Sequence, residues 1–227
     1  MNNVVLCGYR NWAFKIFEKI SENPNLKIIA VIKSNQEFKE KIPTLDPNSI
    51  DFILFIGWSW IIENEITQKF LCLGVHPSDL PYFRGGSPLQ HQIMIGVTNT
   101  KVTLMTLSAD KIDAGDIWIK EDLDLSGDNM DDVFENLILS SIKLLNSFLS
   151  EYPLIKPKYQ NIEKGTYYKR RKPEESKLSK EDFANKTLEE LYNFIRSLSD
   201  PYPNAYLEDE LGNKLVFKNV TYIAKLD

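Results

Sequence analysis

The sequence predicts an α/β fold, with a Rossmann-like, mostly parallel twisted sheet flanked by helices and a small C-terminal extension of one helix and a β-hairpin. Short apolar runs alternate with stretches of helical periodicity over the first 150 residues, which is typical of parallel strands joined by right-handed crossovers. The composition changes at Pro153, where a polar stretch begins. The length of 227 residues suits one large domain with an appendage. We therefore expect a core over 1–152 and an extension over 153–227.

The individual elements follow from the spacing of apolar residues. Uninterrupted apolar runs predict buried strands, which we place at 3–8, 26–32, 52–56, 71–75, 102–107 and 117–123. Apolar residues recurring every three to four positions predict helices at 12–20, 61–70, 88–95 and 130–152. In the extension, Thr187 and Glu190 form a capping-box pattern at the start of a helix over 187–198. A hairpin over 206–217 is expected to turn at Gly212-Asn213.

Charge and cysteine content exclude several classes of protein. The chain has 27 Lys and Arg against 32 Asp and Glu, a net charge of −5, which disfavours nucleic acid as a partner. Cys7 and Cys72 lie in apolar runs without a Cys/His cluster, so no metal is expected. The longest apolar run, 52–62, is interrupted by Gly57 and Ser59 and is too short to cross a bilayer. These features predict a cytoplasmic protein with no membrane partner.

Two histidines, His76 and His91, limit the candidates for acid–base chemistry near pH 7. His76 follows the strand at 71–75, and ligands of open α/β sheets bind beyond the carboxyl ends of strands. His91 lies inside a predicted helix, where a solvated side chain is the favoured interpretation. The loop after His76 holds prolines and Gly85-Gly86, a pattern that suits close approach to a ligand or a plain ordered surface loop. Asp113 lies in a sharp turn between two strands, from which an acidic residue can reach a histidine on a neighbouring strand end and fix its tautomer. Taken alone, however, this segment is better interpreted as a polar turn with glycine for its backbone.

Taken together, these segments resemble the formyltransferase family, whose members transfer a formyl group from 10-formyltetrahydrofolate to an amine. The resemblance covers roughly residues 1–205 and is clearest over 50–120. It is carried by His76-Pro77-Ser78-x-Leu80-Pro81, Arg84-Gly85-x-x-Pro88, Gly96, Val102-Thr103 and Asp113-Ala114-Gly115-Asp116-Ile117, and in the tail by Thr166-Tyr167-Tyr168-x-x-Arg171-x-Pro173-Glu174, Asn193-x-Ile195-Arg196 and Asp200-Pro201-Tyr202-Pro203-x-Ala205.

The resemblance implies a catalytic trio of Asn, His and Asp, and two of its members match His76 and Asp113. The Asn position is occupied by Gly74. We expect a space beside Gly74 that water or the amide of Gln90 or Gln92 fills, so that Gly74→Asn raises turnover. The opposing possibility is that another side chain, or part of the substrate, already occupies that space.

The resemblance also implies the ligands. The donor, 10-formyltetrahydrofolate, is expected beside the loop that follows the strand at 52–56, and no metal is implied. The residues assigned to the donor are Gly57, Trp58, Trp60, Ile61 and Asp110. The residues assigned to the acceptor are Arg10, Ser78, Arg84, Gly85, Tyr168 and Arg170, with Lys169 and Arg171 also available to a diphosphate and Tyr167 or Tyr168 to a base.

Among possible acceptors, the resemblance favours a nucleotide-linked amino sugar, as in bacterial sugar-nucleotide N-formyltransferases of cell-surface glycan (lipopolysaccharide or O-antigen) biosynthesis. Methionyl-tRNA and glycinamide ribonucleotide are the alternatives within the family; the first is disfavoured by the acidic charge and by the roughly 75 residues after the core. Two other classes stay open: a catalytically impaired homologue that binds folate or sugar nucleotide, and a hydrolase that passes the formyl group to water. The resemblance also allows a homodimer.

Overall fold

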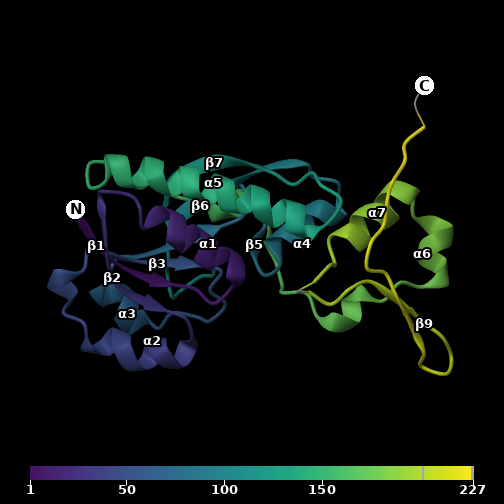
Figure 1. Cartoon of the computed structure of the whole chain (residues 1–227), viewed down its shortest axis with the longest axis horizontal. Coiled ribbons are helices and arrows are strands. Elements are labelled where there is room, and N and C mark those ends of the chain that lie inside the picture. Colours follow the sequence, from purple (N-terminus) through teal and green to yellow (C-terminus); the bar gives the residue numbers. More distant parts are fainter. Residues whose placement is uncertain (201, 226–227) are drawn as a thin grey trace.

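The computed structural model describes residues 1–200 and 202–225 (Figure 1). Over these residues the main sheet has six strands in the order β2-β1-β3-β4-β6-β7. Adjacent members of the first four strands pair in parallel, whereas β6 pairs antiparallel with both β4 and β7. The mostly parallel sheet is therefore confirmed. The strands span Asn2–Cys7 (β1), Leu26–Ile32 (β2), Phe52–Ile56 (β3), Cys72–His76 (β4), Asn99–Thr106 (β6) and Ile117–Asp124 (β7).

The antiparallel half of the sheet departs from the expectation that the strand–helix alternation continues. No helix separates β6 from β7, and the residues between them, 107–116, form a loop too short for a crossover between parallel neighbours. Thr106 lies opposite Leu73, near the beginning of β4, so this loop starts at the end of the sheet away from His76. It then folds back over the face of β4.

Helices cover both faces of the sheet (Figure 1). One face packs on α1 and α5 and buries the larger apolar cluster, which includes Leu6, Ile16, Phe52 and Phe148. The other face packs on α2 and α3. These helices span Asn11–Ile20 (α1), Asn35–Lys41 (α2), Asn64–Lys69 (α3) and Met130–Glu151 (α5), and α4 spans Pro88–Met94.

Two departures concern the second face. Helix α3 begins at Asn64 rather than Ile61, which is 78% exposed in the preceding loop. Helix α2 was not expected, because it buries only Phe38 and so shows little periodicity. Its start is set by Ser34, whose side chain accepts a hydrogen bond from the backbone of Glu37. Short 3-10 turns span Ile42–Thr44, Pro47–Ser49, Ile162–Lys164 and Pro173–Ser176.

The C-terminal part has a small core of its own beside the sheet (Figure 1). The capping box of Thr187 and Glu190 is confirmed at the start of α7, and the antiparallel hairpin of β9 and β10 is confirmed. Helix α6, which begins after a second capping box at Ser179, was not expected in this polar stretch. Pro201 of the tail motif and residues 226–227 lie outside the described residues. The elements span Lys180–Asn185 (α6), Leu188–Arg196 (α7), Tyr206–Glu208 (β9) and Lys214–Val216 (β10).

The chain between α5 and this small core returns to the sheet and helps to build the site. Lys158 forms an antiparallel bridge with Ile117. Further on, β8 (Tyr167–Tyr168) pairs in parallel with β5 (Arg84–Gly85), in the loop after His76. Among the helices that the structure describes, none is long and apolar enough to span a bilayer. Both cysteines are buried free thiols, and burial raises the pKa of Cys72 to about 12.

Candidate active site

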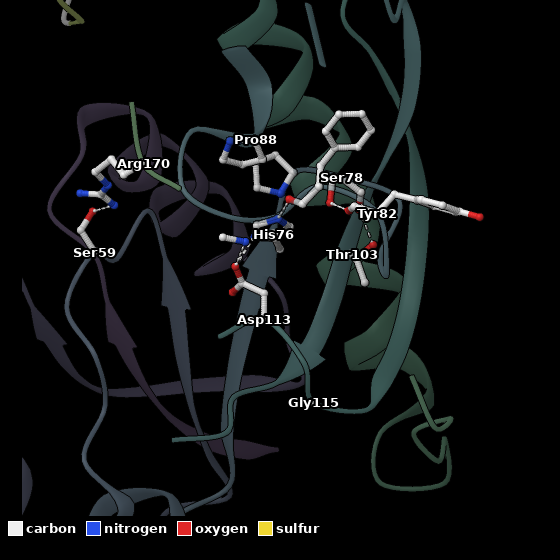
Figure 2. Close-up of polar contacts among 12 residues, drawn as sticks. Ser59, His76, Ser78, Tyr82, Pro88, Thr103, Asp113, Gly115 and Arg170 are labelled. Atoms are coloured by element: carbon white, nitrogen blue, oxygen red, sulfur yellow. Dashed lines mark hydrogen bonds and ion pairs between the residues drawn. The ribbon is translucent and has the colours of Figure 1, made fainter. Parts of the chain in front are cut away.

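His76 is the last residue of β4 and is only 6% exposed. Its Nε2 lies 2.9 Å from the backbone oxygen of Phe83, and its Nδ1 lies 3.4 Å from Oδ2 of Asp113 (Figure 2). A carbonyl oxygen only accepts hydrogen bonds, so Nε2 donates and carries a hydrogen. The ring is thus held between a carbonyl and a carboxylate, and the structure brings together the two residues that the sequence singled out.

Asp113 reaches His76 from the loop that folds over β4. Its backbone is left-handed, with φ 50°, and the loop is tied down by Gln160, whose Nε2 donates to the carbonyls of Asp113 (3.2 Å) and Gly115 (2.7 Å). The carboxylate Oδ2 also accepts a hydrogen bond of 2.9 Å from the backbone of Gly85. Gly85 has φ 96°, and a Cβ there would collide with the carbonyl oxygen of Tyr168. A glycine at this position therefore lets the backbone orient the carboxylate.

The space beside Gly74 is not open. A Cβ on Gly74 would lie 2.6 Å from Cδ2 of Leu107, because the loop after β6 lays the Leu107 side chain over this part of β4. This corrects the expectation of a vacant position and supports the opposing possibility that another side chain uses it. The sequence could not show this, since Leu107 is separated from Gly74 by 33 positions and its loop packs on the face of the sheet rather than at its edge.

The two glutamines that were expected to compensate for the missing Asn, Gln90 and Gln92, make other contacts. The Nε2 of Gln92 donates to the carbonyls of Pro77 and Pro88, both at 2.9 Å, and its Oε1 accepts from Thr100 at 2.6 Å. Gln92 therefore holds α4 to the loop after His76. Gln90 is 3% exposed, and its side-chain amide faces the phenol of Tyr202: burial raises the pKa of Tyr202, and the Gln90 amide opposes that rise.

Two residues assigned to the acceptor, Ser78 and Tyr168, contact other side chains and backbone groups of the protein. Ser78 is fully buried; its hydroxyl donates to the carbonyl of Tyr82, 2.7 Å away, and its own carbonyl accepts from Thr103 at 2.7 Å (Figure 2). In this structure Ser78 shapes the loop after His76. The Tyr168 ring stacks on Phe83 and on His91, with centroid separations of 5.3 and 4.6 Å. His91 is thus half-buried against an aromatic ring and is not the solvated residue that we expected.

The loop after β3 carries most of the residues assigned to the donor. Gly57 has φ 62° and lies against Trp12 and Arg10. Trp58 packs on Phe38 and Phe55, and its indole Nε1 is buried without a partner among the described residues. Two side chains, Trp60 and Ile61, expose apolar surface. Asp110 is exposed, and its backbone contacts Ser108 rather than this loop.

A second polar cluster forms where β1 and β3 end. Ser59 Oγ lies 2.6 Å from the hydroxyl of Tyr9. It also accepts a hydrogen bond of 3.1 Å from Nη2 of Arg170 (Figure 2). Arg10 lies over the Tyr9 ring, 4.6 Å from its centroid. Sequence analysis found the two arginines but missed Tyr9 and Ser59; the polar interruption of an apolar run at Ser59 was the available signal.

Arg84 belongs to a different surface. It lines a depression of about 420 Å³ together with Lys111, Ile112, Ile162 and Tyr167. Its guanidinium lies over the Tyr167 ring, 6.0 Å from the centroid. No group of three or more potential metal ligands is present among the residues that the structure describes.

Comparison with known proteins places this geometry in a family. The family model described as "Formyl transferase" matches residues 10–140. The methionyl-tRNA formyltransferase of Bacillus subtilis is 35% identical over 172 residues, which cover 74% of this chain and 51% of that protein. The chain thus spans about half the length of the curated relatives it matches.

Solved structures share the fold over almost the whole chain. A methionyl-tRNA formyltransferase from Clostridium thermocellum is 30% identical, with a TM-score of 0.79, covering 98% of this chain and 94% of that one. A sugar N-formyltransferase from Shewanella is 17% identical, with a TM-score of 0.80 and coverages of 99% and 100%. HypX from Aquifex aeolicus in complex with tetrahydrofolic acid is 18% identical, with a TM-score of 0.73 and coverages of 95% and 37%. The last two similarities concern the fold alone. The extent of the family match establishes that this chain belongs to the formyl transferase family.

Proposed function

We propose that this protein transfers a formyl group from 10-formyltetrahydrofolate to the amine of a nucleotide-linked amino sugar, in the cytoplasm. The observation that carries the proposal is the His76–Asp113 pair at the carboxyl end of β4, in a chain of the formyl transferase family. Within that family, formyl-tetrahydrofolate is the donor. The acceptor is supported by the cations Arg10 and Arg170, which lie at the same edge of the sheet.

The loop after β3 fits the donor. The buried Nε1 of Trp58 is a hydrogen-bond donor without a partner in the part of the chain that the structure describes, and Trp60 and Ile61 offer apolar surface beside it. Gly57 allows the backbone of this loop to approach a ligand. When bound, 10-formyltetrahydrofolate supplies the formyl group and leaves as tetrahydrofolate, whose N10 receives the proton that the amine loses.

His76 and Asp113 assist the transfer of the proton that the amine loses. The carboxylate of Asp113 faces Nδ1 of His76 and stabilises a positive charge on the ring. Once the contact with the Phe83 carbonyl opens, the hydrogen on Nε2 polarises the formyl oxygen, or passes to N10 of the leaving tetrahydrofolate while Nε2 takes the amine proton in its place. Because Leu107 occupies the space over Gly74, no side-chain amide assists at that position, and His76 carries a larger share of the stabilisation.

Methionyl-tRNA is the second candidate acceptor, favoured by the 35% identity to the Bacillus subtilis enzyme. One assay separates the candidates. The protein is incubated with 10-formyltetrahydrofolate and, separately, with dTDP-, UDP- and GDP-linked amino sugars, methionyl-tRNA and water alone. Mass spectrometry follows the formylated product or free formate. We expect a gain in mass on one nucleotide sugar. Formylation of methionyl-tRNA only, formate release only, or ligand binding without transfer would each refute the proposal.

A further inference from the structure

Residues 158–168, the return segment, contact both of the loops that hold the ring of His76. The segment starts with an antiparallel bridge to the beginning of β7 and ends in β8, which pairs with β5. Its first part lies against the loop that carries Asp113, and its last part lies against the loop that carries Phe83. Because Asp113 faces Nδ1 and the Phe83 carbonyl faces Nε2, both contacts of the ring depend on this one distant part of the sequence (Figure 2).

Gln160 joins the return segment to the loop of Asp113. It is 2% exposed, and its Nε2 donates to the carbonyls of Asp113 (3.2 Å) and Gly115 (2.7 Å). Because a carbonyl only accepts hydrogen bonds, the amide nitrogen has to face the loop, and both of its hydrogens are used there. The Oε1 atom is buried without a hydrogen-bond partner in the described part of the chain. A buried acceptor without a partner destabilises the fold, so the two donated hydrogen bonds have to outweigh that cost.

The backbone that Gln160 holds is in a conformation that needs support. Asp113 has φ 50°, a left-handed conformation that is uncommon for residues other than glycine and persists where surrounding contacts hold it. Two residues further on, a Cβ on Gly115 would lie 1.9 Å from the carbonyl oxygen of Thr106. Gln160 connects the carbonyls of Asp113 and Gly115 within this bend. Without those hydrogen bonds the backbone of Asp113 can relax, which turns its carboxylate away from Nδ1 of His76.

The last part of the return segment holds the loop of Phe83 in a similar way. Phe83 is also left-handed, with φ 55°, and its backbone N–H donates to Oγ1 of Thr166 at 2.8 Å. The backbone N–H of Thr166 donates to the carbonyl of Pro81 at 3.2 Å, and its carbonyl accepts from the backbone of Arg84 at 3.1 Å. The Phe83 carbonyl, which accepts from Nε2 of His76, is therefore held by the same segment that holds Asp113.

We propose that Gln160 is a positioning residue for formyl transfer: its amide keeps Asp113 in the conformation in which the carboxylate meets Nδ1 of His76. The hydrogen bonds of Gln160 reach the backbone of the loop, so it acts through Asp113. Thr166 acts on the other side of the ring, where it holds the Phe83 carbonyl at Nε2. The inference rests on the proposed function in that it takes the reaction to occur at His76, whereas the arrangement of the pair in the free protein is independent of the acceptor.

The ring nitrogens of His76 report this positioning without any substrate. The protein is labelled with ¹⁵N-histidine, and because the chain has two histidines, the signals that disappear in His91→Gln leave those of His76. Gln160→Met removes both donated hydrogen bonds at a similar side-chain length. At neutral pH it should shift the Nδ1 resonance of His76 in the same direction as Asp113→Asn does. Thr166→Val should shift the Nε2 resonance instead, and Thr166→Ser, which keeps the hydroxyl, should restore it.

Ser176→Ala is the matched control. Ser176 is 2% exposed, and its hydroxyl donates to the carbonyl of Pro203 at 3.1 Å, within the C-terminal part of the chain. The variant thus loses a buried hydrogen bond from a side chain to a distant backbone carbonyl, as Gln160→Met does, but away from His76. It should leave both ring resonances of His76 where they are in the parent.

Transfer kinetics distinguish positioning from a general loss of stability. With the acceptor that the mass assay identifies, Gln160→Met should lower kcat about tenfold or more, because misplacing a reacting group by about 1 Å can cost about 10²-fold. Its KM should stay within about twofold of the parent's, since the contacts with the substrates remain. Gln160→Glu, which keeps the shape of the side chain and replaces the donor by a second acceptor, should be at least as slow, and it provides the same test if Gln160→Met does not fold.

The spectra and the kinetics fail separately. An Nδ1 resonance of His76 that is unchanged in both Gln160 variants would overturn the inference, as would a KM that rises by the same factor as kcat falls. A shifted Nδ1 resonance in a protein that formylates no nucleotide sugar would support the positioning role and refute the proposed function. An unshifted resonance in a protein that does formylate one would support the proposed function and refute the role of Gln160.

Discussion

The two polar clusters at the carboxyl edge of the sheet differ in how completely the protein satisfies them. Around His76 each ring nitrogen faces a backbone carbonyl or a carboxylate, and the carboxylate in turn accepts from Gly85. The guanidiniums of Arg10 and Arg170 lie against neutral groups, the Tyr9 ring and the Ser59 hydroxyl. The first cluster is orientated by the chain itself, as a proton-handling pair needs to be before substrate arrives. The second leaves two cations against neutral groups.

If the first cluster does the chemistry, removing its central ring should have the largest effect. We expect His76→Ala to lower kcat/KM for formyl transfer by about 10²–10⁴-fold, the contribution of a general acid–base group. His91→Gln, which changes the other histidine, should leave more than half of the rate. A His76→Ala enzyme that folds, as judged by thermal melting, and keeps more than about a tenth of the rate would contradict the assignment.

The backbone that orients Asp113 offers the next test. Gly85→Ala introduces a Cβ that collides with the Tyr168 carbonyl at a position of φ 96°. Moving the Gly85 N–H away from the carboxylate should cost about tenfold in rate. Gly212→Ala is the matched control, since Gly212 has φ 83° but nothing within 4 Å of an added Cβ. Both variants should lose about 1–2 kcal/mol of stability from the left-handed backbone, and Gly85→Ala should lose more because of the collision. Equal activities in the two variants would show that Gly85 does not contribute to catalysis.

Substitution of Gly74 by Asn should lower the rate of transfer, whereas the sequence predicts that it raises turnover. The effect should be smaller than that of Gly85→Ala. In Gly74→Asn the new side chain displaces Leu107, and overpacking of this kind costs about 1–3 kcal/mol. We expect a lower melting temperature and a severalfold lower kcat/KM. Adding Leu107→Ala should recover part of both. A single Gly74→Asn variant with raised turnover and unchanged melting would show instead that Leu107 yields easily.

The smallest expected effect is on the pH dependence of stability, and it comes from the packing of His91 against Tyr168. Burial, aided by the charge of Arg171, lowers the pKa of His91 below 6.5, against the opposing hydrogen bond to the Lys169 carbonyl. The unfolded chain therefore binds more protons just below pH 6.5, and stability rises with pH through that window and falls as the solution is acidified. In urea denaturation between about pH 5 and 7, His91→Gln should show a shallower dependence on pH than the parent. An identical slope would exclude this contribution.

Local sequence patterns were sufficient for most of the architecture. The apolar runs of β1, β3 and β4 are buried on both faces and needed no further information, and the capping box at Thr187 sets the start of α7. The same patterns left out α2, which buries one residue, and the reversed direction of β6, which depends on pairing rather than on composition.

The candidate site also has features that the sequence predicts and features that only the structure shows. His76 and Asp113 were identifiable because residue type and motif spacing are properties of the chain read in order, and the structure places them 3.4 Å apart. Three features depend on contacts between distant segments: the Leu107 side chain over Gly74, the burial of Ser78, and the hydrogen bond from Arg170 to Ser59. Close packing decides such contacts, because it leaves room for one side chain and excludes another according to how loops cross the sheet. The sequence alone thus determined the family, the sheet and the His76–Asp113 pair, whereas only the tertiary structure decided what surrounds that pair.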